Sequence, residues 1–266
     1  MIFGSFMLRH LQENDFTLVL SGGGALGMAH LGVLHDMEEN NLVPKEIVGT
    51  SMGGIIGAFI AMGLSEDEIY EHIKHFASIS NWVKFSFSGN AILKHAKILN
   101  IFESIVKDAK MKDTKIPLKI IATKLSDGKK KVFDSSDDVM IKDALLATMA
   151  VPGIFEEHII EGSTYVDGFL CENLGVNEAT YDNILAVDVL GANAFDRSMP
   201  DNFFKTSNVL EMFEKSMRLL IYNQSKTHIE HLTKDIYLME PETNKYQTFQ
   251  FHKHSEIRAL GLGLLK

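Results

Sequence analysis

The sequence predicts an α/β fold of the three-layer type, in which helices cover both faces of a mainly parallel central sheet. The apolar run Phe16–Leu20 enters a cluster of glycines, and similar runs recur between helical patterns along the chain. This alternation is typical of such a sheet. The chain has 266 residues, of which 45% are hydrophobic and 23% charged, and this is enough for one large core. We therefore expect a single domain over 1–266, with its core motifs in 16–190 and further helices and a strand in 203–266.

Two local patterns predict further elements. Ser65 and Glu68 fit a capping box, which opens a helix that runs to about residue 77. Residues 117–125 and 130–133 are rich in β-branched side chains and are joined through an Asp-Gly turn. They are therefore expected to form a hairpin.

Charge and cysteine content narrow the function class. The chain carries 35 acidic and 26 basic residues, and its only basic cluster, 129–131, lies in an evident turn, which argues against a nucleic-acid partner. The single cysteine, Cys171, excludes an internal disulfide, and with no secretory leader in the sequence we expect a cytoplasmic protein. The longest apolar stretch, 53–64, is too short to span a bilayer and predicts a buried helix.

The glycine cluster after the first predicted strand has two interpretations. Gly22, Gly24 and Gly27 fit G-x-G-x-x-G, the loop that holds a dinucleotide pyrophosphate. That interpretation requires an acidic residue at the end of the second strand, about 20 residues later, to hold the ribose. Glu46 instead precedes the predicted strand 47–50, and the expected position is occupied by another glycine motif. A dinucleotide site is therefore disfavoured.

The second glycine motif, Gly49-Thr50-Ser51-Met52-Gly53, contains G-x-S-x-G. This motif lifts a serine hydroxyl clear of a sheet when a strand enters it and a helix leaves it. Residues 47–49 are short and mostly β-branched, and Met52–Met62 is continuously apolar or glycine, so both contexts are present. The pattern predicts Ser51 as a nucleophile at a helix N-terminus.

With a nucleophile predicted, the first glycine cluster gains another interpretation. Successive glycines after a strand can turn several backbone N–H groups toward one point and form an oxyanion hole. One such donor stabilises a transition state by roughly 2.7–4 kcal/mol. An ordinary strand-to-helix turn is the alternative, but pairing with G-x-S-x-G favours the oxyanion hole.

A serine nucleophile needs a base, and the chain offers two kinds of candidate. The α/β-hydrolase order requires a late histidine, and His228, His231, His252 and His254 qualify by position. All four lie in polar patterns and are interpreted as solvated surface residues. Asp167 instead follows a short β-forming run at a glycine turn, where α/β active sites collect their residues. A plain Asp-Gly turn is the alternative there.

Three motifs together resemble the patatin-like phospholipase family, with a close match to its short bacterial members. They are the glycine loop 22–27, the segment 49–53 and the pair Asp167-Gly168. The resemblance extends to segments 28–34, 147–155 and 184–188, and it covers most of 16–190.

The resemblance implies a Ser-Asp dyad, with Ser51 the nucleophile and Asp167 the base. It implies an oxyanion hole formed by Gly22, Gly23 and Gly24, to which the first helical residue after the nucleophile, Met52, is added. It also implies acyl hydrolysis of a phospholipid, lysophospholipid or other fatty-acyl ester through an acyl-enzyme, with no cofactor and no metal.

Two positions depart from the family pattern, and other questions stay open. The family usually has Arg or Lys where this chain has Leu26, and a small residue where it has Phe169. Residues 81–106 contain the only tryptophan and are typical of a lid, a membrane-docking edge or a core segment; as an edge they would give peripheral contact with the inner face of a membrane. His72 and His75 have metal-ligand spacing but no third ligand nearby, so they are interpreted as polar surface residues. Two other functions stay open, an esterase with a Ser-Asp-His triad and a catalytically weak regulatory protein.

Overall fold

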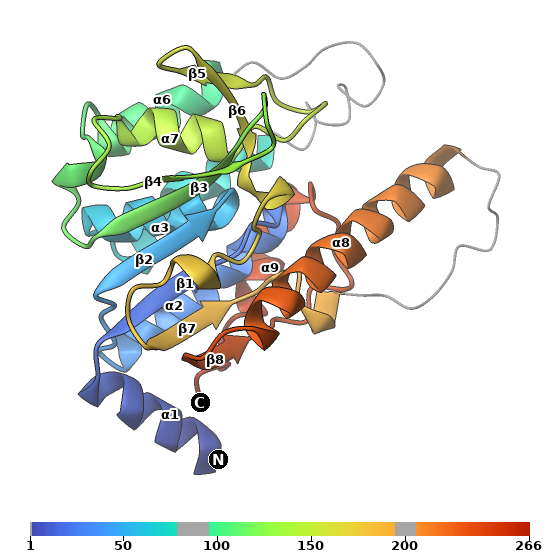
Figure 1. Ribbon diagram of the computed structural model, residues 1–266. Coiled ribbons are helices and arrows are strands. Elements are labelled where there is room, and N and C mark those ends of the chain that lie inside the picture. Colours follow the sequence, from blue (N-terminus) through green and yellow to red (C-terminus); the bar gives the residue numbers. More distant parts are fainter. Residues whose placement is uncertain (1, 79–95, 195–205) are drawn as a thin grey trace.

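A computed structural model describes residues 2–78, 96–194 and 206–266 (Figure 1). Within these ranges eight strands form one sheet in the order β5-β6-β3-β2-β1-β7-β8, and β4 pairs with β3 off this path. The parallel strands are β1 Phe16–Leu20, β2 Glu46–Thr50, β3 Leu118–Lys124, β7 Asn183–Val187 and β8 Asp235–Met239. The antiparallel ones are β4 Lys130–Phe133, β5 His158–Ile160 and β6 Ser163–Asp167. The predicted mainly parallel sheet is confirmed.

The described residues also form α-helices before, between and after the strands. They are α1 Ile2–Glu13, α2 Ala29–Glu39, α3 Met52–Met62, α4 Glu66–Ile73, α6 Ala96–Val106, α7 Ile141–Thr148, α8 Thr206–Glu230 and α9 His254–Ala259. Short 3₁₀ turns connect them, including η1 Gly24–Met28, η2 Lys74–Ser78, η4 Gly168–Leu170 and η5 Val176–Glu178. No helix in the described part of the chain is both long and apolar enough to cross a membrane.

The central strands are buried on both faces, which gives the three layers. Successive strand residues point to opposite faces, so Leu18 and Leu20 join one hydrophobic cluster while Val19 joins another. The larger cluster includes residues of α2, α3, α7 and α9. The smaller one is closed by residues 174–179 and by the end of α8 (Figure 1). The predicted three-layer fold is confirmed.

The strand register brings two distant parts of the chain together. At Ala122, β3 pairs with both β4 and β6, so those strands lie on opposite edges of β3. At Ile121, β3 pairs with both β4 and β2, so β2 and β6 share one edge. Thr50 lies opposite Ile121, and Asp167 lies opposite Ala122. The last residue of β6 therefore lies beside the residue that follows β2.

The local predictions hold, with small shifts. β3 and β4 form the expected hairpin, and Ser65 caps α4 through a complete capping box with Glu68. The helix ends at Ile73 rather than near residue 77 and continues as η2, because the last turn tightens to 3₁₀ geometry, as helix ends often do.

The expectation for residues 81–106 falls partly on residues that the structure does not describe. Residues 96–106 of this segment form α6. Residues 79–95, with Trp82, Phe85 and Phe87, lie outside the described residues. The structure therefore leaves the role of 81–106 a prediction.

Candidate active site

Ser51 stands at a sharp turn between β2 and α3. Its backbone has φ 51° and ψ −124°, a left-handed φ that is rare for a residue with a side chain. The flanking glycines make the turn possible: a Cβ on Gly49 would lie 2.6 Å from the Gly53 carbonyl oxygen, and one on Gly53 would lie 2.3 Å from the Leu20 carbonyl oxygen. The geometry is that of a nucleophile elbow.

The hydroxyl of Ser51 donates a hydrogen bond to the carboxylate of Asp167, with Oγ 2.7 Å from Oδ2. This distance is within the range required for direct proton transfer between a nucleophile and its base. The two side chains are brought together by the register in which β6 continues the edge that β2 leaves. The residue after Asp167 must be a glycine for β6 to lie this close to β3, since a Cβ on Gly168 would lie 2.2 Å from the Ile121 carbonyl oxygen.

Burial controls the charge of Asp167. The side chain is fully buried, and burial raises the pKa of its carboxyl from 3.8 to about 7. The N–H of Phe169, 3.0 Å from Oδ1, and the hydroxyl of Ser51 oppose the rise by stabilising the charged form. The result is a carboxylate far more basic than an ordinary aspartate, as a general base near neutral pH requires.

A threonine holds the elbow in place. Thr148 Oγ1 accepts the Ser51 N–H at 2.8 Å and donates to the Ile121 carbonyl oxygen. The family resemblance covers segment 147–155, but no pattern in the sequence predicts a role for the Thr148 hydroxyl. Thr148 thus connects α7 to the elbow, although the two residues are 97 positions apart in the sequence.

The glycine loop lies against the elbow. A Cβ on Gly22 would lie 3.0 Å from Cβ of Ser51, and one on Gly27 would lie 2.4 Å from Cγ of Met52. The N–H of Gly22 donates to the Asn173 carbonyl oxygen at 3.3 Å. Those of Gly23, Gly24 and Met52 donate to no acceptor in the described part of the chain. Three of the four expected oxyanion donors are thus available to a ligand.

The two departures from the family pattern have different surroundings. Leu26 is fully buried and packs in the larger hydrophobic cluster, so this position faces the core. Phe169 is partly buried against the same cluster, and its backbone N–H is the one that bonds Asp167.

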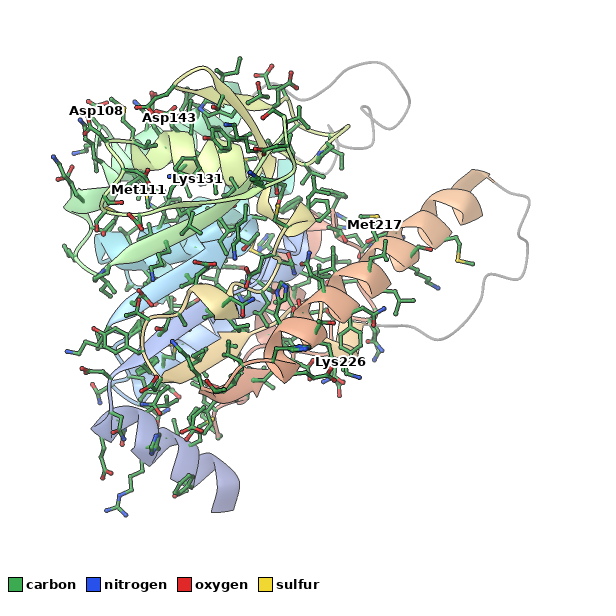
Figure 2. The ribbon with its side chains drawn as sticks, viewed as in Figure 1. Asp108, Met111, Lys131, Asp143, Met217 and Lys226 are labelled. Carbon is green, nitrogen blue, oxygen red and sulfur yellow. The ribbon has the colours of Figure 1, made fainter. Side chains whose placement is uncertain are left out.

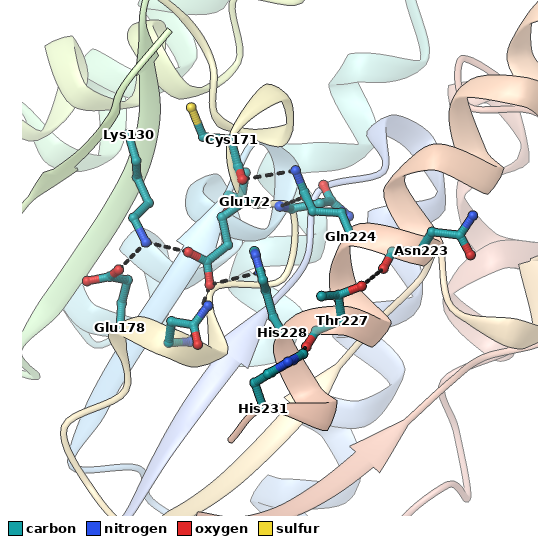
Figure 3. Close-up of polar contacts among 12 residues, drawn as sticks. Lys130, Cys171, Glu172, Glu178, Asn223, Gln224, Thr227, His228 and His231 are labelled. Atoms are coloured by element: carbon teal, nitrogen blue, oxygen red, sulfur yellow. Dashed lines mark hydrogen bonds and ion pairs between the residues drawn. The ribbon is translucent and has the colours of Figure 1, made fainter. Parts of the chain in front are cut away.

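The hydrogen bonds of Ser51 involve no histidine of the described residues. His228 lies 3.5 Å from Glu172 and is partly buried (Figure 3), and His254 bonds the Tyr70 hydroxyl at 2.8 Å. The expectation that these two are solvated is therefore wrong, because helix packing places each against a polar partner. His231 and His252 are exposed, as expected.

His30 is buried beside the glycine loop. Its Nε2 donates to the Ser21 carbonyl oxygen at 2.9 Å, and burial lowers its pKa to about 4. The ring is therefore neutral at pH 7 and holds the backbone at the start of the loop.

Sequence reasoning missed two buried polar residues near the loop. Asp188 follows β7, and burial raises the pKa of its carboxyl to about 6, against the N–H of Leu190 and the hydroxyl of Ser21. Asn173 donates from Nδ2 to the Gly22 carbonyl oxygen at 3.3 Å. No group of three or more His, Cys, Asp and Glu side chains among the described residues is placed to hold a metal ion.

The fold has three layers around an α/β sheet, and its site pairs a buried aspartate with a serine at a turn between a strand and a helix. These features are those of a serine hydrolase fold. The chain belongs to the patatin-like phospholipase family, whose model matches residues 18–180.

Relatives of the chain include proteins of bacteria and yeasts. It is 31% identical over 186 residues to an uncharacterized NTE family protein of Mycobacterium tuberculosis, which covers 67% of this chain and 50% of that protein. It is 26% identical over 284 residues to lysophospholipase NTE1 of Kluyveromyces lactis, which covers 96% of this chain and 19% of that protein. The chain thus spans half the length of the first relative and a fifth of the second. VipD from Legionella pneumophila aligns with a TM-score of 0.46 at 10% identity, over 92% of this chain and 66% of that one.

Proposed function

We propose that the protein is a serine lipid acyl hydrolase, in which Ser51 and Asp167 act as a catalytic dyad. The observation that carries the proposal is the hydrogen bond of 2.7 Å from Ser51 Oγ to Asp167 Oδ2 at a nucleophile elbow. Membership in the patatin-like phospholipase family supports the reaction class.

The reaction divides between the two side chains. Asp167 Oδ2 takes the Ser51 proton as Oγ attacks the ester carbonyl carbon. The oxyanion that forms is stabilised by the free N–H groups of Gly23, Gly24 and Met52. The Gly22 N–H is not part of the proposed oxyanion hole, because it already donates to the Asn173 carbonyl oxygen. The intermediate collapses, the alcohol leaves with the proton from Asp167, and an acyl-enzyme remains on Ser51. Asp167 then accepts a proton from the water that attacks the acyl carbon. As the acyl–Oγ bond breaks, Asp167 returns that proton to Ser51 Oγ, and the fatty acid is released.

The substrate class rests on the relatives. Because the yeast relative is named a lysophospholipase, we propose a phospholipid, lysophospholipid or related fatty-acyl ester as substrate, with no cofactor. Peripheral contact with the inner face of a membrane and a cytoplasmic location remain part of the proposal. The buried Leu26 offers no cation to an anionic head group.

The proposal is tested by labelling with a fluorophosphonate and by hydrolysis of lysophosphatidylcholine. We expect one labelled peptide, with the probe on Ser51, and release of fatty acid that labelling abolishes. A folded protein that is not labelled and releases no fatty acid would favour the regulatory alternative. Loss of labelling on replacing His228, His231, His252 or His254 would favour the triad.

The pH dependence of turnover is a further prediction. Asp167 must be ionised to accept the proton, and its pKa is raised to about 7. We expect kcat/KM to rise with pH through an apparent pKa of about 7 and to level off above it, measured with a soluble short-chain ester. Burial also raises the pKa of Asp188, to about 6. Asp188→Asn is therefore the control, and in this variant kcat/KM should still rise through an apparent pKa of about 7. A profile flat from pH 5 to 9 would contradict the role of Asp167.

A further inference from the structure

The glycine loop is anchored at its first end to α8. Gly22 bonds Asn173 twice, with its N–H on the Asn173 carbonyl oxygen and its own carbonyl oxygen accepting from Asn173 Nδ2, each at 3.3 Å. Gln224 of α8 holds that segment. Its Oε1 accepts the Asn173 N–H at 2.9 Å, and its Nε2 donates to the Cys171 carbonyl oxygen at 2.9 Å (Figure 3). One amide side chain thus fixes the backbone on which Gly22 rests.

The other end of the loop is anchored to the same helix through Thr248. The Ala25 N–H donates to the Thr248 carbonyl oxygen at 2.7 Å. Gly24, with φ +55°, lacks the Cβ that would lie 2.3 Å from that oxygen, so a glycine is required for the contact. Glu214 of α8 holds Thr248: its Oε1 accepts the Thr248 N–H at 2.8 Å and the hydroxyl at 2.7 Å.

A buried arginine completes this second anchor. Arg218 is 7% exposed and lies one turn after Glu214, to which its Nη2 donates at 2.8 Å. It also donates to the carbonyl oxygens of Tyr246 at 2.8 Å and Ala194 at 3.3 Å. The charge is therefore paired and hydrogen-bonded, which is the condition for burying it. Figure 2 labels Met217 and Lys226, which bracket the stretch of α8 that carries Arg218 and Gln224.

We propose that α8 is a positioning element for the oxyanion hole, although it lies outside the matched residues 18–180. The free N–H groups of Gly23 and Gly24 stand between the two anchored residues, Gly22 and Ala25. Fixing both ends fixes the peptide planes between them, and an oxyanion donor contributes only when it is held in place beforehand. This inference rests on the proposed function, since it assigns α8 a part in the same reaction.

The chain offers a matched control at the opposite end of the strands, at the start of β2. Glu46 at the start of β2 accepts the N–H and the hydroxyl of Thr180, each at 2.7 Å. Lys119 bonds both Glu46 and the Thr180 hydroxyl at 2.8 Å. Glu46, Thr180 and Lys119 thus form the same kind of contacts as Glu214, Thr248 and Arg218. They lie at the beginning of β2, whereas Ser51 follows the end of that strand. Thr180→Val thus removes the same kind of hydroxyl away from the site.

The experiment compares Thr248→Val and Gln224→Met with the controls Thr180→Val and Asn223→Met. Hydrogen exchange followed by mass spectrometry reports on residues 21–28 without requiring activity. We expect exchange there to be at least about tenfold faster in the two α8-anchor variants and unchanged in the controls. With a soluble ester we expect kcat to fall about 10- to 100-fold in the anchor variants, with KM within about threefold, since the donors act in the transition state. Thr248→Ser, which keeps the hydroxyl, should restore both readouts.

Each outcome decides the inference. Unchanged protection of residues 21–28 in both anchor variants would overturn it, whatever the activity. Faster exchange with unchanged kcat would also overturn it, because the loop position would not matter for turnover. A wild-type protein without hydrolysis or labelling would refute the proposed function instead, and exchange alone would then decide whether α8 holds the loop. If Thr248→Val does not fold, Gln224→Met tests the other anchor by the same measurements.

Discussion

Replacing Ser51 with alanine is expected to lower kcat for ester hydrolysis by about 10⁴- to 10⁶-fold, the loss typical of removing a catalytic serine. The change deletes the hydroxyl that we propose as the nucleophile, which is also the donor of the hydrogen bond of 2.7 Å to Asp167. The fold should survive, because the elbow is held by other groups. Thr148 bonds the backbone N–H of residue 51, and the Ile55 N–H bonds its carbonyl oxygen.

The measurement is turnover of a soluble short-chain ester, with circular dichroism to verify folding. A matched serine control is Ser65→Ala, which removes the N-cap of α4. It should lower the free energy of unfolding by about 1 kcal/mol and leave kcat unchanged. Turnover above background in folded Ser51→Ala, measured against that control, would rule out Ser51 as the nucleophile.

The sequence predicted the elements whose signals are local. The elbow is encoded by glycines within five residues, and the glycines are needed because Gly49 and Gly53 pack against backbone. The capping box at Ser65 and the hairpin of β3 and β4 are equally local. The single-domain organisation stays a prediction.

The parts of the site that the sequence did not predict depend on contacts between distant residues. Asp167 could be proposed as the base only with the family resemblance, since its partner lies 116 residues away and is reached through the register of β3. Thr148 and Asn173 bond backbone groups, which leave no pattern in the sequence. His228 was misplaced for the same reason, because its buried partner Glu172 lies on another segment.

Replacing Asp167 with asparagine is expected to cost about as much activity as Ser51→Ala, on the order of 10⁴-fold or more, since the two residues act as one unit. Asparagine keeps the shape and can still accept the Phe169 N–H, but it cannot take the proton from Ser51. Activity retained in a folded Asp167→Asn protein would contradict the dyad.

The same substitution should make the protein more stable at neutral and alkaline pH. Burial raises the pKa of Asp167 from 3.8 to about 7, so the folded state holds the proton more tightly than the unfolded state. The free energy of unfolding of the wild type therefore falls as pH rises from about 4 to about 7, and asparagine removes that loss. The stability advantage of Asp167→Asn should grow over this range by up to about 4 kcal/mol.

Denaturant unfolding at pH 4 and pH 8 measures that advantage. Asp134→Asn is the control of opposite sign, because hydrogen bonds from Ser136 lower the pKa of Asp134 and its charge favours the folded state. That variant should become less stable relative to wild type as pH rises, with unchanged turnover. An advantage of Asp167→Asn that is the same at both pH values would show that the Asp167 carboxyl is not held at a raised pKa. The combination of lost turnover and gained stability is what a buried base predicts, because the burial that makes Asp167 basic enough for catalysis also makes its charge costly to the fold.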